Sequence, residues 1–197
     1  MRKYIAILIR DENTIEEDIF YIKAVEMFKG EVLFIYDNED FEDIFNKLIL
    51  VKGILLTGGY DVGRIDFYLI EYALQNNLKI FGICQGMQSM ALYGTCNKLE
   101  QIGNNNHDKN RKYVHSVDIY PGRLNSIIMT DKCMVNSHHQ QTVFSPGLFR
   151  VVAKSDDGLI EAIENDNHIF QIGVQWHPER MIEYDLVSRR IFSSFVN

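Results

Sequence analysis

The feature that most constrains this chain is a regular alternation, in its first half, of short apolar runs with longer amphipathic segments. The apolar runs cover residues 4–9, 32–36, 53–56 and 80–83. Runs this short suit strands that are buried on both faces. The segments between and after them have helical patterns and cover residues 14–28, 40–48, 66–75 and 85–93. Because strand–helix–strand units cross over with one hand, the alternation predicts a parallel sheet covered by helices on both faces.

The first helical segment carries its own boundary signals. Thr14 with Glu17 three residues later matches a capping box, and Gly30 ends the segment. One apolar stripe of this segment consists of Ile15, Ile19, Ile22, Val25 and Phe28. Such a stripe is typical of a helix that packs on a core.

The second half of the chain has a different pattern. Residues 103–112 are polar and rich in Asn, which predicts an exposed loop. Strand-like runs separated by turn residues follow at 114–120, 151–154, 159–164 and 169–175, and a last helix is expected at 184–195. The predicted fold class is therefore α/β: an open, mostly parallel central sheet with helices on both faces and a short antiparallel extension. We expect a single domain over residues 1–197.

Composition excludes several classes of protein. The chain is 46% hydrophobic and 24% charged, which is ordinary for a globular domain. A formal net charge of −7 argues against general nucleic-acid binding through a basic face. Three cysteines without a CxxC pair argue against a disulfide framework. No apolar run approaches the roughly 18 residues that span a bilayer, so we expect a cytoplasmic protein with no membrane partner.

Cys84 lies in the first of three clusters that could carry chemistry. It stands where a predicted strand meets a predicted helix, and Gly82 and Gly86 flank it. Glycines flank the nucleophile in the same way in a strand–turn–helix elbow, where the tight turn needs small neighbours. The N-terminus of the following helix would direct N–H groups and positive potential at the sulfur. The alternative is a buried structural cysteine.

His177 and Glu179 form the second cluster. In an extended segment, residues two apart face the same side, so this carboxylate and this imidazole point the same way. A carboxylate beside an imidazole fixes its tautomer and favours the imidazolium, as the base partner of a cysteine requires. A surface turn is the alternative. The third cluster, Gly58 and Gly59 after a strand, would let the backbone approach a ligand closely, although a plain turn also explains it.

Taken together, the motifs of this chain resemble those of a known family. The matching segments occur in the family's order and cover residues 54–62, 82–88, 135–141, 157–162 and 173–179. They resemble the class I glutamine amidotransferase-like hydrolases, which share a flavodoxin-like fold. The resemblance is stronger to the γ-glutamyl hydrolase branch, peptidase family C26, which includes the γ-glutamyl-γ-aminobutyrate hydrolases.

The resemblance implies a function and a set of site residues. Cys84, His177 and Glu179 would form a catalytic triad that cleaves a γ-glutamyl amide bond through a γ-glutamyl thioester. The backbone N–H groups of Gly59 and Gln85 would hold the oxyanion. The residues implied as substrate-binding are Gly58, Gln88, Asn136, Ser137, His139 and Gln141. All of these except Gly58 could instead support the site from beneath.

Departures from the family pattern bear on the substrate. The loop after Asp61 and Val62 is shorter than in usual members, and this should open one wall of the cleft to a larger leaving group. Some members of this branch cleave γ-glutamyl-CDP-amidate in capsule biosynthesis. The locally basic stretch 107–112 could contact the diphosphate of such a substrate, or it could be a solvated loop.

Other functions stay open at this point. The chain could be a glutaminase subunit that delivers ammonia to a synthetase partner, or a binding protein on the same fold. A metal site built from His107, His115, His138, His139 and Cys133 lacks recognisable ligand spacing, so we expect no metal. We also expect no cofactor, because the triad supplies nucleophile, acid–base and oxyanion functions. The oligomeric state cannot be deduced from the sequence.

Overall fold

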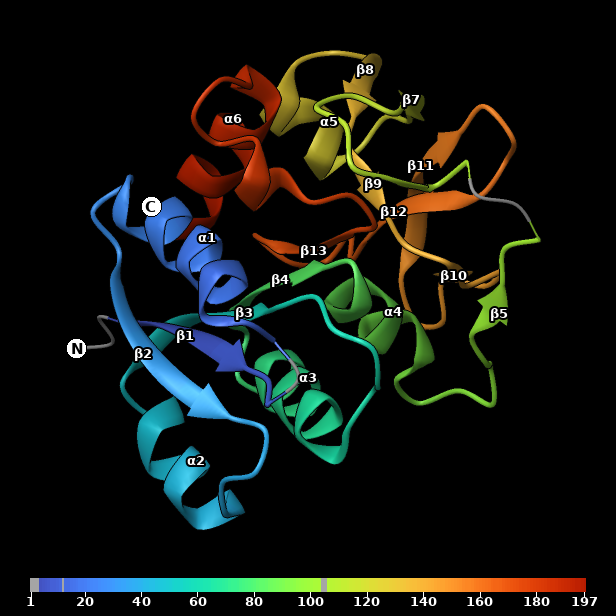
Figure 1. Ribbon diagram of the computed structural model, residues 1–197. Helices are drawn as coiled ribbons and strands as arrows, with labels where there is room; N and C mark the ends of the chain where they lie inside the picture. Colours follow the sequence, from blue (N-terminus) through green and yellow to red (C-terminus); the bar gives the residue numbers. More distant parts are fainter. Residues whose placement is uncertain (1–3, 12, 104–105) are drawn as a thin grey trace.

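A mixed sheet forms the centre of the computed structural model, which describes residues 4–11, 13–103 and 106–197 (Figure 1). Within these residues it has nine strands. In spatial order they are β2 (Glu31–Tyr36), β1 (Tyr4–Ile9), β3 (Val51–Leu56), β4 (Lys79–Ile83), β13 (Gln171–Val174), β12 (Ile160–Glu164), β11 (Arg150–Ser155), β7 (His115–Ile119) and β8 (Lys132–Val135). Pairing is parallel from β2 to β13 and antiparallel from β13 to β8. The predicted α/β sheet with an antiparallel extension is confirmed.

Helices cover both faces of this sheet (Figure 1). One face packs against α1 (Ile15–Glu26), α5 (Arg123–Ile128) and α6 (Leu186–Val196). The other packs against α2 (Phe41–Leu48), α3 (Arg64–Gln75) and α4 (Gln85–Leu92). Each face of the sheet thus has its own hydrophobic core. Strand β1 contributes to both, because its side chains alternate between the faces: Ile5 and Ile7 lie in one core, and Ala6 and Leu8 lie in the other. No helix of the described residues is both long and apolar enough to cross a membrane.

Helix α1 begins as predicted, and its apolar stripe is buried only in part. Thr14 caps the helix and exchanges hydrogen bonds with Glu17, so the capping box is confirmed. Ile15 and Ile19 of the apolar stripe are 77% and 38% exposed, however, and the prediction that this stripe packs on the core is wrong for them. The prediction is confirmed for Val25, which is buried, and for Ile22 and Phe28, which are partly buried against the core. Tyr21 and Ala24 are also buried. The Tyr21 hydroxyl accepts a hydrogen bond from the Gly58 N–H, which holds that face of α1 to the sheet.

Several elements of the second half were not predicted from the sequence. They are α5, β8, the short 3₁₀-helix η1 (Pro178–Arg180), and the short strands β5 (Glu100–Gln101), β6 (Asp108–Lys109), β9 (Ser137–His138) and β10 (Gln141–Thr142). The expectation of an exposed loop over 103–112 is confirmed at Gly103, Asn106 and residues 110–112 but is wrong for residues 107–109. Residues 104 and 105 lie outside the described residues. His107 is buried, and β6 pairs with β9. Backbone pairing to a distant segment holds this stretch in place, and local polarity does not reveal such pairing.

A buried ion pair lies beneath the carboxyl edge of the parallel strands. Arg10 follows β1, and its Nη2 lies 2.6 Å from Oδ1 of Asp66 on α3. The Asp66 carboxylate also accepts hydrogen bonds from Ser89 Oγ on α4 and from the Gly63 N–H. Both charged side chains are almost fully buried. This network ties β1, α3 and α4 together under the edge where ligands of such sheets bind.

Replacement of Asp66 by asparagine is expected to destabilise the fold by about 3–5 kcal/mol, because it removes the carboxylate charge that lies 2.6 Å from the buried Arg10 guanidinium. Urea-induced unfolding followed by circular dichroism measures the loss. Asp156→Asn is the matched control, since Asp156 pairs with Lys132 on the exposed surface and should leave the midpoint unchanged. Equal midpoints for the two variants would show that the Arg10–Asp66 pair does not stabilise the fold.

Candidate active site

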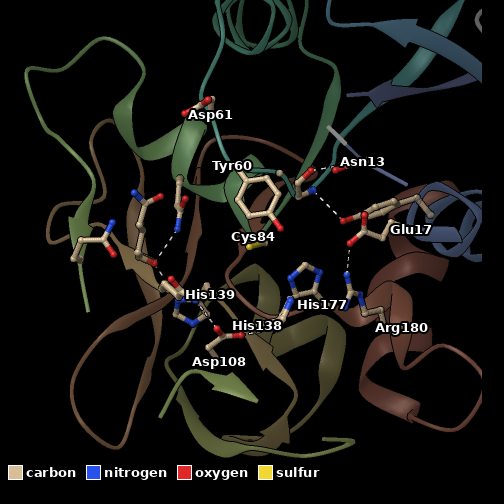
Figure 2. A pocket seen from close by; sticks show the side chains of 17 residues that line it. Asn13, Glu17, Tyr60, Asp61, Cys84, Asp108, His138, His139, His177 and Arg180 are labelled. Atoms are coloured by element: carbon tan, nitrogen blue, oxygen red, sulfur yellow. Dashed lines mark hydrogen bonds and ion pairs between the residues drawn. The ribbon is translucent and has the colours of Figure 1, made fainter. Parts of the chain in front are cut away.

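The three clusters predicted from the sequence meet at one edge of the sheet. Cys84 follows β4, Gly58 and Gly59 follow β3, and His177 follows β13. These strands are parallel neighbours, so their carboxyl ends lie at the same edge. There the residues line a cleft of about 550 Å³ (Figure 2).

Cys84 sits on a strained turn between β4 and α4. Its φ of 53° and ψ of −109° place a residue with a side chain in the left-handed half of conformational space. The flanking glycines make the turn possible. A Cβ on Gly86 would lie 2.3 Å from the carbonyl oxygen of Leu56, and one on Gly82 would lie 2.6 Å from the backbone of Gly86. The geometry is that of the nucleophile elbow predicted from the sequence.

His177 is held between Glu179 and Cys84. Its Nδ1 lies 2.7 Å from Oε1 of Glu179, whose side chain is fully buried. The other ring nitrogen has no hydrogen-bond partner among the described residues, and the ring lies beside the sulfur of Cys84 (Figure 2). Burial alone would lower the pKa of His177, but the Glu179 carboxylate and Cys84 outweigh it and raise that pKa to about 10. The imidazolium is therefore the favoured form near neutral pH.

Asn136 and Ser137 have supporting positions in this structure. Both polar atoms of the Asn136 side chain bind the backbone of His177: Nδ2 donates to its carbonyl at 2.8 Å, and Oδ1 accepts from its N–H at 2.9 Å. Ser137 Oγ donates to the carbonyl of His107. Neither residue lines the cleft. These contacts agree with the supporting role that the sequence left open for both residues, and they hold the backbone of His177 in place through Asn136.

The backbone donors expected for an oxyanion differ in their surroundings. The Gly58 N–H is engaged by the Tyr21 hydroxyl at 2.9 Å, whereas Gly59 lines the cleft beside Cys84. Gln85 is the first residue of α4, and its N–H is one of the helix N-terminal donors that have no intrahelical acceptor. The Gln85 side chain points elsewhere and donates to the Asp61 carbonyl.

The remaining residues expected to bind substrate, Gln88, His139 and Gln141, all line the cleft. Gln88 Nε2 donates to the carbonyl of Gln141 at 3.0 Å and to Oε1 of Gln175 at 3.2 Å. This joins α4 to the wall formed by residues after β9.

Sequence reasoning missed two residues at the site. Gln175 Nε2 lies 3.6 Å from the sulfur of Cys84, within reach of a weak N–H to sulfur hydrogen bond. Its position two residues before His177 was a usable signal, because alternate residues of an extended segment share a side. Tyr21 lines the cleft from α1, and burial raises its pKa well above the usual value. Nothing local marks Tyr21 as a site residue.

The same residues fall within a known family. A model of the family Peptidase C26 matches residues 63–179, well over half of the chain, and the match includes Cys84, His177 and Glu179. The chain belongs to the peptidase C26 family. The resemblance seen in the sequence motifs is thereby confirmed.

Individual relatives agree with this assignment to peptidase C26. The γ-glutamyl-γ-aminobutyrate hydrolase PuuD of Escherichia coli is 35% identical over 154 residues, which cover 69% of this chain and 60% of PuuD. A Schizosaccharomyces pombe protein named as a candidate glutamine amidotransferase is 34% identical, and the match covers 67% of this chain and 55% of that protein. This chain thus spans little more than half the length of these two relatives. The glutamine amidotransferase-like protein YvdE of Lactococcus lactis matches over 98% of both chains at 28% identity.

Solved structures match this peptidase C26 chain over nearly its whole length. The glutaminase domain of Trypanosoma brucei CTPS has a TM-score of 0.74 at 16% identity, and the match covers 98% of this chain and 92% of that one. A glutamine amidotransferase from Thermotoga maritima has a TM-score of 0.65 at 16% identity, and the match covers all of this chain and 97% of that one. At such low identity these matches show a shared fold, that of the class I glutamine amidotransferases.

Proposed function

We propose that this chain is a cysteine hydrolase that cleaves a γ-glutamyl amide and releases glutamate and an amine. The observation that carries the proposal is the buried His177–Glu179 pair beside Cys84, which stands on a strained elbow at the edge of a ligand-sized cleft. The name of the relative PuuD supports the same substrate class.

The proposed reaction has two stages, acylation of Cys84 and hydrolysis of the resulting thioester. The Cys84 thiolate attacks the γ-carbonyl carbon, and the carbonyl electron pair moves to oxygen, where the N–H groups of Gly59 and Gln85 donate to it. The C–N bond then breaks while His177 gives its proton to the departing nitrogen, leaving a γ-glutamyl thioester. Water attacks the thioester, His177 accepts a proton from it, and glutamate leaves with Cys84 restored.

The charges of the cleft suit the amino-acid end of a γ-glutamyl group, which carries one ammonium and one carboxylate. Arg180 lines one side of the cleft beside Glu17, and Asp108 lines another. Groups of both signs can therefore meet the two charges of the substrate.

The basic stretch 107–112 gives no support for a nucleotide amidate as substrate. Of its residues, only Asp108 lines the cleft. His107 is buried, and the Lys112 ammonium lies over the Tyr184 ring, 3.7 Å from its centre. A small or polyamine-like leaving group needs no such contact, so we propose an amine as the leaving group.

A panel of γ-glutamyl compounds assayed for released glutamate tests the proposal. It contains γ-glutamyl-γ-aminobutyrate, γ-glutamyl-CDP-amidate and glutamine, with the Cys84→Ala variant as the blank. We expect the γ-glutamyl amine to be hydrolysed without any partner protein and faster than glutamine. Slow hydrolysis of glutamine alone would favour a glutaminase subunit, and inertness toward every compound would overturn the proposal.

Glu179→Gln is expected to slow hydrolysis by about 10²-fold or more and to move the alkaline limb of kcat/KM toward neutral pH. The reason is that the Glu179 carboxylate, together with Cys84, outweighs the effect of burial and raises the pKa of His177 to about 10. With a raised pKa the imidazolium persists into alkaline solution; without that charge it loses its proton at lower pH. A pH profile of kcat/KM measures the shift.

The neighbouring Glu183→Gln is the matched control, because Glu183 is exposed and lies outside the cleft. Alkylation of Cys84 by iodoacetamide should persist in Glu179→Gln, since the sulfur is retained. An unchanged alkaline limb would mean that Glu179 does not set the protonation of His177.

A further inference from the structure

A second cluster of titratable side chains lies behind the wall of the cleft. It consists of His107, His115, His139 and Glu161, and we call it the His–Glu cluster. One possible ligand atom from each residue lies within 4.8 Å of all the others. The four come from β12, from the start of β7, from the segment before β6 and from the segment after β9. The three histidines were among the possible ligands named from the sequence, where the spacing gave no reason to expect a metal. Glu161 was not among them, and it replaces His138 and Cys133 in the observed cluster.

Three of the four residues are buried and His115 is partly buried, and among the described residues the facing atoms have no hydrogen-bond partners. The side chains of His107 and His139 are 2% exposed, and that of Glu161 is fully buried. No partner is present for His107 Nδ1, His115 Nε2, His139 Nε2 or either carboxylate oxygen of Glu161 among the described residues. The three ring nitrogens lie 3.4, 3.6 and 3.7 Å from Glu161 Oε1, which is too far for good hydrogen bonds. Leaving such buried groups unpaired is costly.

The outer contacts set the tautomer of each ring. Nε2 of His107 lies 2.9 Å from the Asp157 carboxylate, Nδ1 of His139 lies 3.0 Å from the Gln141 carbonyl, and Nδ1 of His115 lies 3.2 Å from the Ser116 carbonyl. Each of these acceptors takes the ring proton, so each neutral ring turns a lone pair toward Glu161. A single added proton could satisfy one of these lone pairs and would leave two facing a carboxylate. A cation satisfies all of them.

We propose that the His–Glu cluster binds a structural Zn²⁺ ion through three imidazole nitrogens and one carboxylate oxygen. Ligand atoms about 2.0–2.1 Å from a tetrahedral zinc stand roughly 3.3 Å apart, close to the separations around Glu161 Oε1. Ring N–H groups that donate to a carboxylate or to backbone carbonyls are the usual outer partners of zinc-bound histidines. The charges also balance, because the carboxylates of Glu161 and Asp157 offset the two positive charges of the ion. Four protein ligands leave no open position, so the site is structural.

The ion would stabilise the wall of the cleft that His139 and Gln141 form. His139 lines the cleft and hydrogen bonds through Nδ1 to Gln141, another lining residue. The His107 carbonyl accepts hydrogen bonds from Ser137 Oγ and from the His139 N–H, so the same segments are already linked. The inference does not depend on the proposed hydrolase function, since metal content is measured without substrate.

Metal analysis of the untagged, full-length chain tests the proposal. We expect about one zinc per chain to remain after gel filtration, and cobalt substitution should give the visible absorption of tetrahedral Co²⁺. Glu161→Gln and His115→Ala should lose the metal. The glutamine amide can donate to the facing ring nitrogens, which gives that variant a means to fold without zinc. His168→Ala is the matched control, because this histidine lies outside the cluster and should keep full metal content.

A graded variant separates ligation from mere folding. Asp157→Asn leaves every proposed ligand in place and should weaken zinc binding by about 10–100-fold in a chelator competition. Three results would each overturn the proposal: no zinc retained by the wild-type chain and no tetrahedral cobalt spectrum; equal metal content in wild type and Glu161→Gln; or equal affinity in wild type and Asp157→Asn.

Discussion

Cys84→Ala is expected to abolish hydrolysis of γ-glutamyl amides while leaving the fold intact. The rate should fall by about 10⁴–10⁶-fold, the scale on which loss of a triad nucleophile slows acyl-transfer enzymes. The fold should survive, because alanine keeps the β-carbon of a buried residue and removes only the sulfur. Released glutamate measures activity, and circular dichroism with thermal melting measures the fold.

The chain supplies a matched control for this result. Cys96 is exposed and lies outside the cleft, so Cys96→Ala makes the same chemical change without touching the site. This variant should retain full activity. Appreciable turnover by Cys84→Ala would mean that another group is the nucleophile.

Gly86→Ala is expected to destabilise the fold by about 3 kcal/mol, near the upper end of the cost of overpacking. The added Cβ would lie 2.3 Å from the carbonyl oxygen of Leu56, a backbone atom that no rotamer change can move aside. Helix propensity acts in the opposite direction, since alanine is favoured over glycine by roughly 1 kcal/mol inside a helix. The steric cost is larger, so the net effect is destabilising. Urea-induced unfolding measures it.

Activity of Gly86→Ala should fall as well, because the clash displaces the turn that carries Cys84. A misplacement of about 1 Å at a reacting atom can cost 10²-fold in rate. Gly103→Ala is the control, since a Cβ on Gly103 meets nothing within 4 Å. A Gly86→Ala variant as stable and active as Gly103→Ala would show that the elbow tolerates a side chain there.

The parallel half of the fold could be predicted from the sequence because its signals are local. Each short apolar run became one strand, and Tyr4–Ile9 matches β1 at both ends. The antiparallel half was harder, since β6 and β9 contain two residues each and exist only through pairing with each other. Helix α1 shows a second limit: the predicted apolar stripe is buried at Val25 but exposed at Ile15 and Ile19, and the contact of Tyr21 with Gly58 is not visible in the helical period.

The candidate site likewise contains residues that could be predicted from the sequence and residues that could not. Cys84, His177 and Glu179 stand in short motifs, so their residue types and spacing alone indicate chemistry. The two hydrogen bonds from Asn136 to the His177 backbone are not visible in spacing, because they join residues that lie close only in the folded chain. Glu161 was missed for the same reason.

The position of β13 in the sheet determines when the site can form during translation. Of the nine strands of this sheet, β13 is the last to leave the ribosome, yet it lies between β4 and β12 and carries the segment that leads to His177. While that segment is still inside the exit tunnel, the thiol of Cys84 has no base beside it. The proposed chemistry can therefore begin only after His177 has emerged, so that shorter nascent chains stay inactive.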